Sequence, residues 1–265
     1  MGALNEFDIT GHKTLIIGGS RGIGRGIARA FADAGSDVAI TGLTDSNAKI
    51  LADELSVTGV KTLALGGDAT KAKDTDEIVD TVLSEWGGVD TLINCVGDAI
   101  RKPVAKLPGT NLEGMSEEEW HFIVDINLTE AFQGCRALGP HFLEKQNGNV
   151  INISGWASFR GRAQSAAYDA AKAGVMRFTE CLAQEWAPYN IRVNAVAPGR
   201  FPDPEQMTKE VYAGREKEAA EEIPLGRLGR LKEPGYLCVF LASGAASYIT
   251  GQTWAIDGGI SIKHP

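Results

Sequence analysis

The sequence predicts an α/β protein with a doubly wound parallel sheet and helices on both of its faces. Short apolar runs alternate with segments whose apolar residues recur at helical spacing. The runs are continuously apolar, which is typical of parallel strands that helices cover on both sides. We expect about seven such strands in one domain over residues 1–265, because no linker, repeat or change of composition divides the chain.

The first half of the chain is predicted to alternate between strands and helices. An apolar run that ends in glycine opens the series, and Gly35 closes the helix that follows it. Residues 89–96 (VDTLINCV) are expected to form a fully buried strand. The predicted strands are 14–19, 37–41, 60–65 and 89–96, and the predicted helices are 23–34, 48–55 and 76–86.

This alternation breaks at residues 98–115, which contain prolines and have no clear period, so we expect an inserted loop there. Ser116 and Glu119 have the spacing of a capping box, which predicts a long helix that runs beyond Asn127. A buried strand over residues 150–153 follows. An irregular loop then leads into an Ala-rich helix.

The last third of the chain contains two further predicted strands, 190–197 and 253–256, and a core helix, 235–241. Between them, residues 200–222 are charged and only weakly amphipathic. A polar segment that follows the carboxyl end of a strand can be a mobile lid or an ordinary surface helix. The sequence leaves both possibilities open.

Composition excludes several classes of function. The formal net charge is −8, so no basic surface favours nucleic acid or an anionic membrane. No apolar run has the length of a membrane span or of a signal-peptide core, and we expect a cytoplasmic protein. His121 and His141 have no ligand partners in the sequence, so no metal site is predicted. The cysteines (Cys95, Cys135, Cys181 and Cys238) are far apart, which favours reduced thiols.

A glycine-rich turn, residues 18–24 (GGSRGIG), joins the first strand to the first helix. Such a turn lets backbone N–H groups approach a pyrophosphate, and it directs the helix dipole at the phosphates. The spacing is G-x-x-x-G-x-G rather than the commoner G-x-G-x-x-G. A tight turn without a ligand is the alternative. A P-loop is excluded because no Gly-Lys-Ser/Thr follows.

Tyr168 and Lys172 lie four residues apart on the Ala-rich helix, and they therefore share one helix face. A nearby cation lowers the pKa of a phenol, which makes tyrosine a usable proton donor and acceptor near neutral pH. Taken alone, a Tyr and a Lys at this spacing more often form a solvated helix surface than a catalytic pair. Its meaning depends on the other motifs.

Together the motifs resemble the classical short-chain dehydrogenase/reductase family over essentially the whole chain, and most closely its reductases of 3-oxoacyl thioesters and similar ketones. The resemblance implies a Rossmann-like fold, hydride transfer between NAD(P)(H) and a small ketone/secondary alcohol pair, and a homotetramer or homodimer. The matching positions are Gly18, Gly22, Gly24, Asp68, Asn94, Cys95, Val96, Gly97, Asn127, Tyr168, Lys172, Pro198, Gly199, Asp257, Gly258 and Gly259.

The resemblance also implies a role for each motif. Tyr168 would be the general acid and base, Lys172 would lower its pKa and bind the nicotinamide ribose, and Asn127 would hold a water that links Lys172 to solvent. Residues 98–115 and 200–222 would lie on the substrate side. The pyrophosphate is expected on Gly18, Ser20, Arg21, Gly22, Ile23 and Gly24, the adenine on Asp68 and Ala69, its ribose on Asn94 to Gly97, and the nicotinamide on Pro198 and Gly199.

One departure from the family affects catalysis. Family members place a serine at the end of the fifth strand, where its hydroxyl binds the substrate oxygen. Counting back from Tyr168 or forward from Asn127 places that position at Gly155. Ser154 is the preceding residue, and because side chains alternate along a strand it should point to the other face unless the strand bulges.

Three outcomes remain open at this position. Local rearrangement could bring Ser154 into the site as a catalytic residue. Another group, such as Trp156, Ser158 or the substrate itself, could hold the oxygen. Alternatively, the chain could be a cofactor-binding relative with weak or no catalysis. Losing one oxyanion donor typically costs about 10²–10³ in rate, which weakens an enzyme without abolishing it, so an active enzyme is favoured.

The end of the second predicted strand bears on the choice of cofactor. An NAD-selective site needs an acid there, and the sequence has Gly42. Arg21 could pair with a 2′-phosphate, which favours NADP(H), whereas the nearby Asp45 keeps NAD(H) possible. For the substrate, Arg160 and Arg162 could form a cationic rim for an anionic group, or they could simply be solvated.

Overall fold

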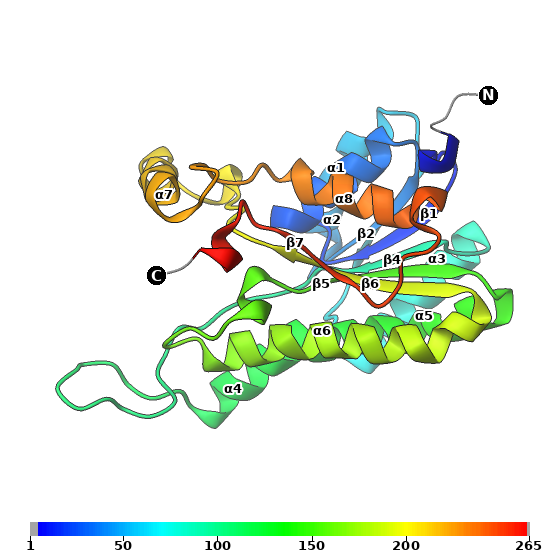
Figure 1. Cartoon of the computed structure of the whole chain (residues 1–265). Coiled ribbons are helices and arrows are strands. Elements are labelled where there is room, and N and C mark those ends of the chain that lie inside the picture. Colours follow the sequence, from blue (N-terminus) through cyan, green and yellow to red (C-terminus); the bar gives the residue numbers. More distant parts are fainter. Residues whose placement is uncertain (1–4, 264–265) are drawn as a thin grey trace.

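The computed structural model describes residues 5–263, and its centre is a seven-stranded sheet in the order β3-β2-β1-β4-β5-β6-β7 (Figure 1). Every pairing between neighbouring strands is parallel. The doubly wound parallel sheet predicted from the sequence is thereby confirmed. The strands are β1 (Lys13–Ile17), β2 (Asp37–Gly42), β3 (Thr62–Gly66), β4 (Thr91–Asn94), β5 (Gly148–Ile153), β6 (Ile191–Pro198) and β7 (Thr253–Ile256).

Helices cover both faces of this sheet (Figure 1). One face carries α1 (Gly22–Asp33), α2 (Asp45–Ser56) and α8 (Lys232–Ala242). The other face carries α3 (Ala72–Trp86), α5 (Glu130–Lys145) and α6 (Ala166–Trp186). Two further helices, α4 (Glu117–Val124) and α7 (Lys209–Glu222), lie toward one end of the molecule.

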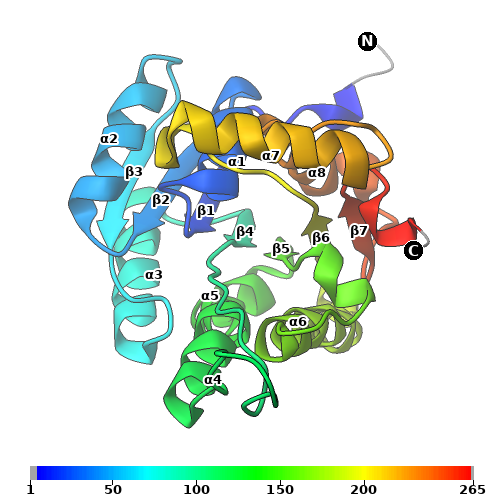
Figure 2. The same ribbon diagram turned by 90° about the vertical axis from the view of Figure 1, so that its left-hand side faces the viewer.

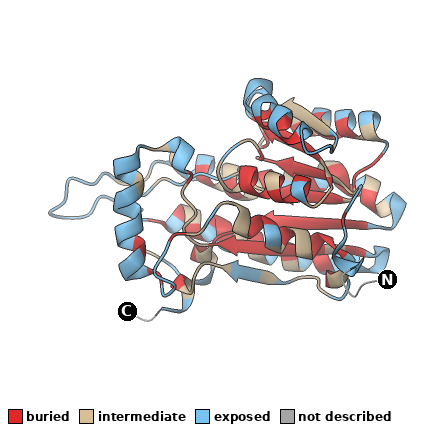
Figure 3. Cartoon of the chain, turned by 90° about the horizontal axis from the view of Figure 1, so that it is seen from above, coloured by how far each residue is buried: buried red, intermediate tan, exposed pale blue. Residues whose placement is uncertain are grey.

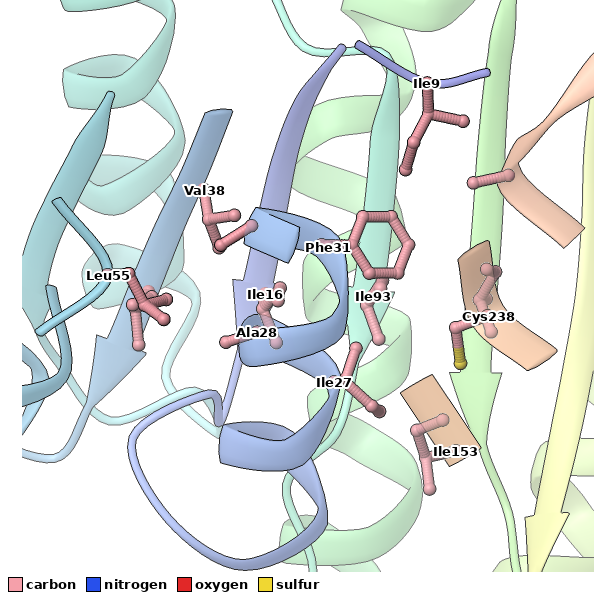
Figure 4. Close-up of a cluster of buried hydrophobic side chains, with 14 of the residues drawn as sticks. Ile9, Ile16, Ile27, Ala28, Phe31, Val38, Leu55, Ile93, Ile153 and Cys238 are labelled. Carbon is pink, nitrogen blue, oxygen red and sulfur yellow. The ribbon is translucent and has the colours of Figure 1, made fainter. Parts of the chain in front are cut away.

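Side chains alternate along each strand, so one strand contributes residues to two separate cores, one on each face of the sheet. Ile16 of β1 joins Ile27 and Phe31 of α1 on one face, as Figure 4 shows. Its neighbour Leu15 joins Phe142 of α5 on the other face. All five side chains are fully buried. This two-sided burial explains why the strands read as continuous apolar runs in the sequence.

The bounds of two predicted elements are corrected. The strand expected over residues 89–96 is restricted to Thr91–Asn94, because the chain leaves the sheet at Cys95. The helix after Ser116 has the predicted capping box, with Glu119 N–H donating to Ser116 Oγ at 3.2 Å. That helix does run past Asn127, but a π turn over Asp125–Thr129 separates α4 from α5. A π turn inserts one residue into the helix and so reorients the side chains that it carries.

The strand order reverses between β1 and β4, and in doubly wound folds ligands bind at the carboxyl ends of the strands at such a point. Residues 98–115 form no helix or strand. This segment and α7 lie at the same end of the molecule, which Figure 2 shows face-on. Most residues of α7 are exposed (Figure 3). None of the described helices is both long and apolar enough to cross a membrane.

Candidate active site

A cavity of about 690 Å³ opens beside the glycine turn, at the point where the strand order reverses. It extends from Leu43, just after β2, to Tyr168 and Lys172 on α6. Residues far apart in the sequence, including most of those predicted from it, meet in this one cavity. The predicted residues in its wall are Gly18, Ser20, Arg21, Gly22, Ile23, Gly24, Asp68, Ala69, Cys95, Val96, Gly97, Ser154, Tyr168 and Lys172.

Three predicted cofactor contacts lie outside this wall. Asn94 is fully buried, and its side chain donates to Asn152 Oδ1 at 2.8 Å, so it ties β4 to β5. Pro198 is the last residue of β6, and Gly199 N–H donates to the carbonyl of Ile256 at 2.9 Å. Asn94 and Gly199 are thus each tied to a neighbouring strand. Residues that the sequence did not single out also line the cavity, among them Asn47, Asp98, Phe201 and Gln206.

The glycine turn packs too closely for any side chain at two of its glycines. A Cβ on Gly18 would lie 2.8 Å from the carbonyl carbon of Cys95, and Gly18 has a φ of +83°. A Cβ on Gly24 would lie 2.1 Å from the carbonyl oxygen of Gly18. The N-terminus of α1 lies in the cavity wall, an arrangement that favours binding of an anion.

Asp203, which the sequence did not identify, lies at this helix N-terminus. The side chain is 6% exposed. Its Oδ2 accepts from Gly22 N–H at 3.0 Å and from Arg25 Nη2 at 2.6 Å. Arg25 also pairs with Glu205. The beginning of the predicted lid is therefore attached to the glycine turn through Asp203, whereas α7 is largely exposed.

Replacing Asp203 with asparagine should lower the free energy of unfolding by about 1.5–3 kcal/mol, because the charge-assisted hydrogen bond from buried Arg25 is lost. Chemical denaturation would measure this. Glu205→Gln is the matched control, since Glu205 also pairs with Arg25 but is 58% exposed, and its loss should cost less than about 1 kcal/mol. Equal costs for the two variants would contradict the structural role of Asp203.

Tyr168 and Lys172 lie in different electrostatic surroundings. Lys172 is 3% exposed, and its Nζ donates to the carbonyl of Ile153 at 2.9 Å. Burial raises the pKa of Tyr168, and Arg162 and Arg101 partly offset this. That Lys172 lowers the pKa of Tyr168, as helical spacing suggests, stays a prediction, since no hydrogen bond between the two side chains is present in the described residues. The ammonium group is directed at backbone carbonyls instead.

Asn127 is held in place by the π turn. Its Nδ2 donates to the carbonyls of Asp98 and Ile123 at 2.7 and 2.9 Å. Its Oδ1 is buried and has no hydrogen-bond partner among the described residues. A Cβ on Gly97 would lie 2.9 Å from this oxygen and 3.3 Å from Lys172 Nζ. Asn127 and Lys172 therefore flank Gly97, and only glycine leaves them this space.

Ser154 and Gly155, the two residues that follow β5, have different surroundings. Ser154 N–H donates to the carbonyl of Val196 at 2.8 Å, and its hydroxyl donates to the same oxygen at 3.4 Å. Gly155 has an extended backbone, and a Cβ on it would lie 3.3 Å from the Tyr168 hydroxyl. The position nearest to Tyr168 is thus Gly155. Although Ser154 lines the cavity, its hydroxyl is engaged by the backbone of β6.

The two arginines expected at the rim are engaged by other groups. Arg162 donates to the carboxylate of Asp169, with Nη2–Oδ1 at 2.6 Å, and its guanidinium lies 4.7 Å from the centre of the Trp156 ring. Arg160 donates to the carbonyl of Lys263 at 2.9 Å. The charge of Arg162 is therefore largely compensated, which weakens the case for a cationic rim. Across residues 5–263, no three potential metal ligands come together.

Comparison with known proteins gives independent evidence on the family to which this chain is similar. The family model described as enoyl-(acyl carrier protein) reductase matches residues 17–261. The chain is 37% identical over 251 residues to 3-oxoacyl-(acyl-carrier-protein) reductase FabG of Chlamydia muridarum, covering 93% of this chain and 96% of that protein. It is 33% identical over 257 residues to 2-dehydro-3-deoxy-D-gluconate 5-dehydrogenase of Dickeya dadantii, covering 97% and 98%.

A solved structure is similar over nearly the whole chain. It is a gluconate 5-dehydrogenase from Burkholderia cenocepacia in complex with NADP and tartrate, with a TM-score of 0.89 and 28% sequence identity. The match covers 99% of this chain and 100% of that one. Relatives with different substrates thus share one fold with this chain, so the fold alone does not identify a substrate.

Proposed function

Because the chain belongs to the short-chain dehydrogenase/reductase family and is an oxidoreductase of hydroxyl and keto groups, we propose that it transfers hydride between NADP(H) and a ketone/secondary alcohol pair, with Tyr168 as general acid and base. The observation that supports this most strongly is the meeting of the glycine turn, Tyr168 and Lys172 in one cavity. Because the enzymes of this family use NAD(P), a dinucleotide is the expected ligand of the cavity.

The residues of the cavity fit a dinucleotide. The close-packed glycine turn and the N-terminus of α1 lie in the cavity wall, where backbone N–H groups other than that of Gly22 would bind the pyrophosphate. Asp68 and Ala69 would hold the adenine at one end, and Lys172 would hold the nicotinamide ribose at the other. Asn94 for the adenine-side ribose, and Pro198 and Gly199 for the nicotinamide, stay predictions, since these residues lie outside the cavity wall. When bound, the cofactor supplies or accepts the hydride.

The chain's own residues handle the proton. In the direction of reduction, Tyr168 would donate its hydroxyl proton to the carbonyl oxygen as that oxygen gains negative charge. Burial keeps the Tyr168 phenol protonated, because it raises the pKa. Lys172 would restore the lost proton, and Asn127 Oδ1, which is buried beside Lys172, would hold the water that leads to solvent.

Gly155 leaves the usual serine position without a hydroxyl, so the substrate oxygen would depend mainly on Tyr168. We do not assign Ser154 a catalytic role, because its hydroxyl donates to Val196. Ser158 has a buried hydroxyl without a partner among the described residues, and it is the best remaining side-chain candidate. The alternative function, a cofactor-binding relative with weak or no catalysis, rests on Gly155.

A cofactor-oxidation assay over a panel of ketones, combined with NADPH binding by calorimetry, separates these functions. An active oxidoreductase should oxidise NADPH in the presence of at least one ketone and should bind NADPH without any. Tight binding with no turnover over the whole panel would favour the cofactor-binding relative. Absence of NADPH and NADH binding would contradict both functions.

The preference for NADP(H) is supported by the corner of the cavity beyond β2. Gly42, Leu43 and Asn47 line it, and Asp45 does not. Arg21 lies in the same wall. No carboxylate from the segment just after β2 lines this corner to repel a 2′-phosphate, and the guanidinium of Arg21 would bind it.

Replacing Arg21 with alanine should raise the Kd of NADPH about tenfold and leave that of NADH within about twofold, because only NADPH carries the 2′-phosphate. Calorimetric titration of both cofactors would measure this. Arg29→Ala is the matched control, since Arg29 lies on the same helix but pairs with Glu54 at 2.7 Å. A parallel loss of both affinities would indicate that Arg21 acts on the fold of the turn instead.

Two further proposals concern the surroundings of the site. Trp120, Phe122 and Phe132 are exposed on α4 and α5, and an aromatic surface of this kind supports the proposed homotetramer or homodimer. Residues 98–115 and 200–222 lie at the end of the molecule where the strands finish, which supports a substrate-side loop and a lid.

Free cysteine thiols favour the cytoplasm as the compartment.

A further inference from the structure

Arg162 lies between the loop that follows β5 and the start of α6. Its guanidinium lies 5.8 Å from the centre of the Tyr168 ring and 4.7 Å from the centre of the Trp156 ring. Both distances are within the range of cation–π contacts. Trp156 directly follows Gly155, where a Cβ would lie 3.3 Å from the Tyr168 hydroxyl. One guanidinium therefore lies against the proposed general acid and against the residue next to position 155.

The Asp169 carboxylate fixes this guanidinium from a second side. Arg162 Nη2 donates to Asp169 Oδ1 at 2.6 Å, and Arg162 Nε donates to Asp169 Oδ2 at 3.2 Å. The backbone N–H of Arg162 donates to the same Oδ2 at 2.9 Å. Ser165 accepts from Arg162 Nη2 at 3.0 Å and donates to Asp169 Oδ1 at 2.9 Å. Because Asp169 and Ser165 are buried, this two-pronged pair holds the guanidinium in one orientation.

Neither role that the sequence suggests for Arg162 fits this arrangement. A solvated arginine would leave its donors to water, whereas Arg162 is half-buried and donates to Asp169 and Ser165. A cationic rim would need an arginine in the cavity wall, and Arg162 lies outside it. The network instead ties the loop that carries Trp156 to the helix that carries Tyr168.

The charges nearest to Tyr168 act in opposite directions. Burial raises the pKa of Tyr168, Arg162 lowers it, Asp169 on α6 raises it, and Arg101 from the loop over residues 98–115 lowers it. Arg162 and Asp169 thus oppose each other at the phenol although they form one ion pair. The other charged or titratable residues in the wall of the cavity are Arg21, Asp68, Cys95, Asp98 and Lys172.

We propose that Arg162 is a positioning residue for Tyr168, which it holds in place for proton transfer while it keeps a positive charge beside the phenol. The inference rests on the proposed function. In reduction, the Tyr168 O–H bond breaks as the O–H bond of the alcohol forms, and NADPH supplies the hydride with its electron pair. The phenolate that remains is stabilised by the guanidinium, and a ring that is oriented before the substrate binds loses little entropy in the reaction.

Replacing Arg162 with methionine removes the charge and keeps an apolar side chain beside the two rings. It should lower kcat about tenfold and leave the Kd of NADPH within about twofold, because Arg162 lies outside the cavity wall. Arg162→Lys keeps the charge and should restore part of kcat. Arg177→Met is the matched control, since Arg177 pairs with Glu180 on α6 but is exposed. It should keep the wild-type kcat in steady-state assays.

The ion pair also gives a readout without substrate that a purely structural role would not move. Arg162→Met should raise the pKa of Tyr168 and Asp169→Asn should lower it, although both variants break the same pair and both should lower Tm. Phenolate absorbance is titrated for each variant with and without Tyr168→Phe, and the difference isolates Tyr168 from the other tyrosines. Arg177→Met should leave this titration unchanged.

A shift of both variants in the same direction, or no shift in either while Tm falls, would show that Arg162 only stabilises the fold and would overturn the proposal. If Arg162→Met does not fold, Asp169→Asn decides, and a pKa of Tyr168 that does not fall in that variant overturns the proposal. Wild-type turnover in Tyr168→Phe would instead overturn the proposed general acid, whatever the titration shows.

Discussion

Replacing Tyr168 with phenylalanine is expected to lower kcat by about 10²–10⁴-fold and to leave the Kd of NADPH within about threefold. The change removes one hydroxyl oxygen and keeps the ring that packs beside Arg162. Without that hydroxyl, the substrate oxygen loses its proposed proton donor. Neither residue after β5 replaces it, because Gly155 has no side chain and the Ser154 hydroxyl donates to Val196. Steady-state kinetics and calorimetric NADPH binding would measure the two quantities.

Tyr189→Phe is the control for this experiment, because Tyr189 is 43% exposed and lies outside the cavity wall. It should retain the wild-type kcat. A Tyr168→Phe variant with turnover within twofold of the wild type would exclude Tyr168 as the general acid. Loss of NADPH binding together with turnover would instead indicate a structural defect, and the thermal stability of the variant would reveal it.

Local sequence patterns predict the sheet because the physical cause of each strand is local. Val150 and Ile151 are buried on opposite faces of β5, so the strand is apolar at both positions. Tyr168 and Lys172 are predictable for a similar reason, since a four-residue spacing on a helix fixes a common face. Their shared cavity with the glycine turn follows from the parallel topology, which brings the carboxyl ends of the strands to one edge.

Long-range contacts could not be predicted in this way. Gly22 and Asp203 are 181 residues apart, and no local pattern marks Asp203 as the partner of a helix N-terminus. Glu130 reads as an ordinary surface glutamate in the sequence, but the structure buries it at the start of α5. Asn94 lies at the predicted strand end, but no local pattern predicts the hydrogen bond that its side chain donates to Asn152.

Restoring the missing hydroxyl with Gly155→Ser is expected to raise kcat by about 10²–10³-fold, the range that one oxyanion donor contributes elsewhere. Gly155 has φ −175°, an extended conformation that serine adopts without strain. The added Cβ would lie 3.3 Å from the Tyr168 hydroxyl, so the tyrosine needs to shift by only a few tenths of an ångström. The serine oxygen would then lie beside Tyr168, where the substrate oxygen is expected.

Gly155→Ala separates the effect of the hydroxyl from that of the added Cβ, because both variants introduce the same atom next to Tyr168. If serine accelerates turnover and alanine does not, the oxygen lacks a second donor in the wild type. If serine is no better than alanine while the wild type is active, another group, with Ser158 the first candidate, already holds the oxygen. If all three forms bind NADPH and none turns over a ketone, binding without catalysis is the function of the chain. The two variants thus test whether catalysis is limited by one missing hydroxyl at position 155, where the extended backbone can accept a serine.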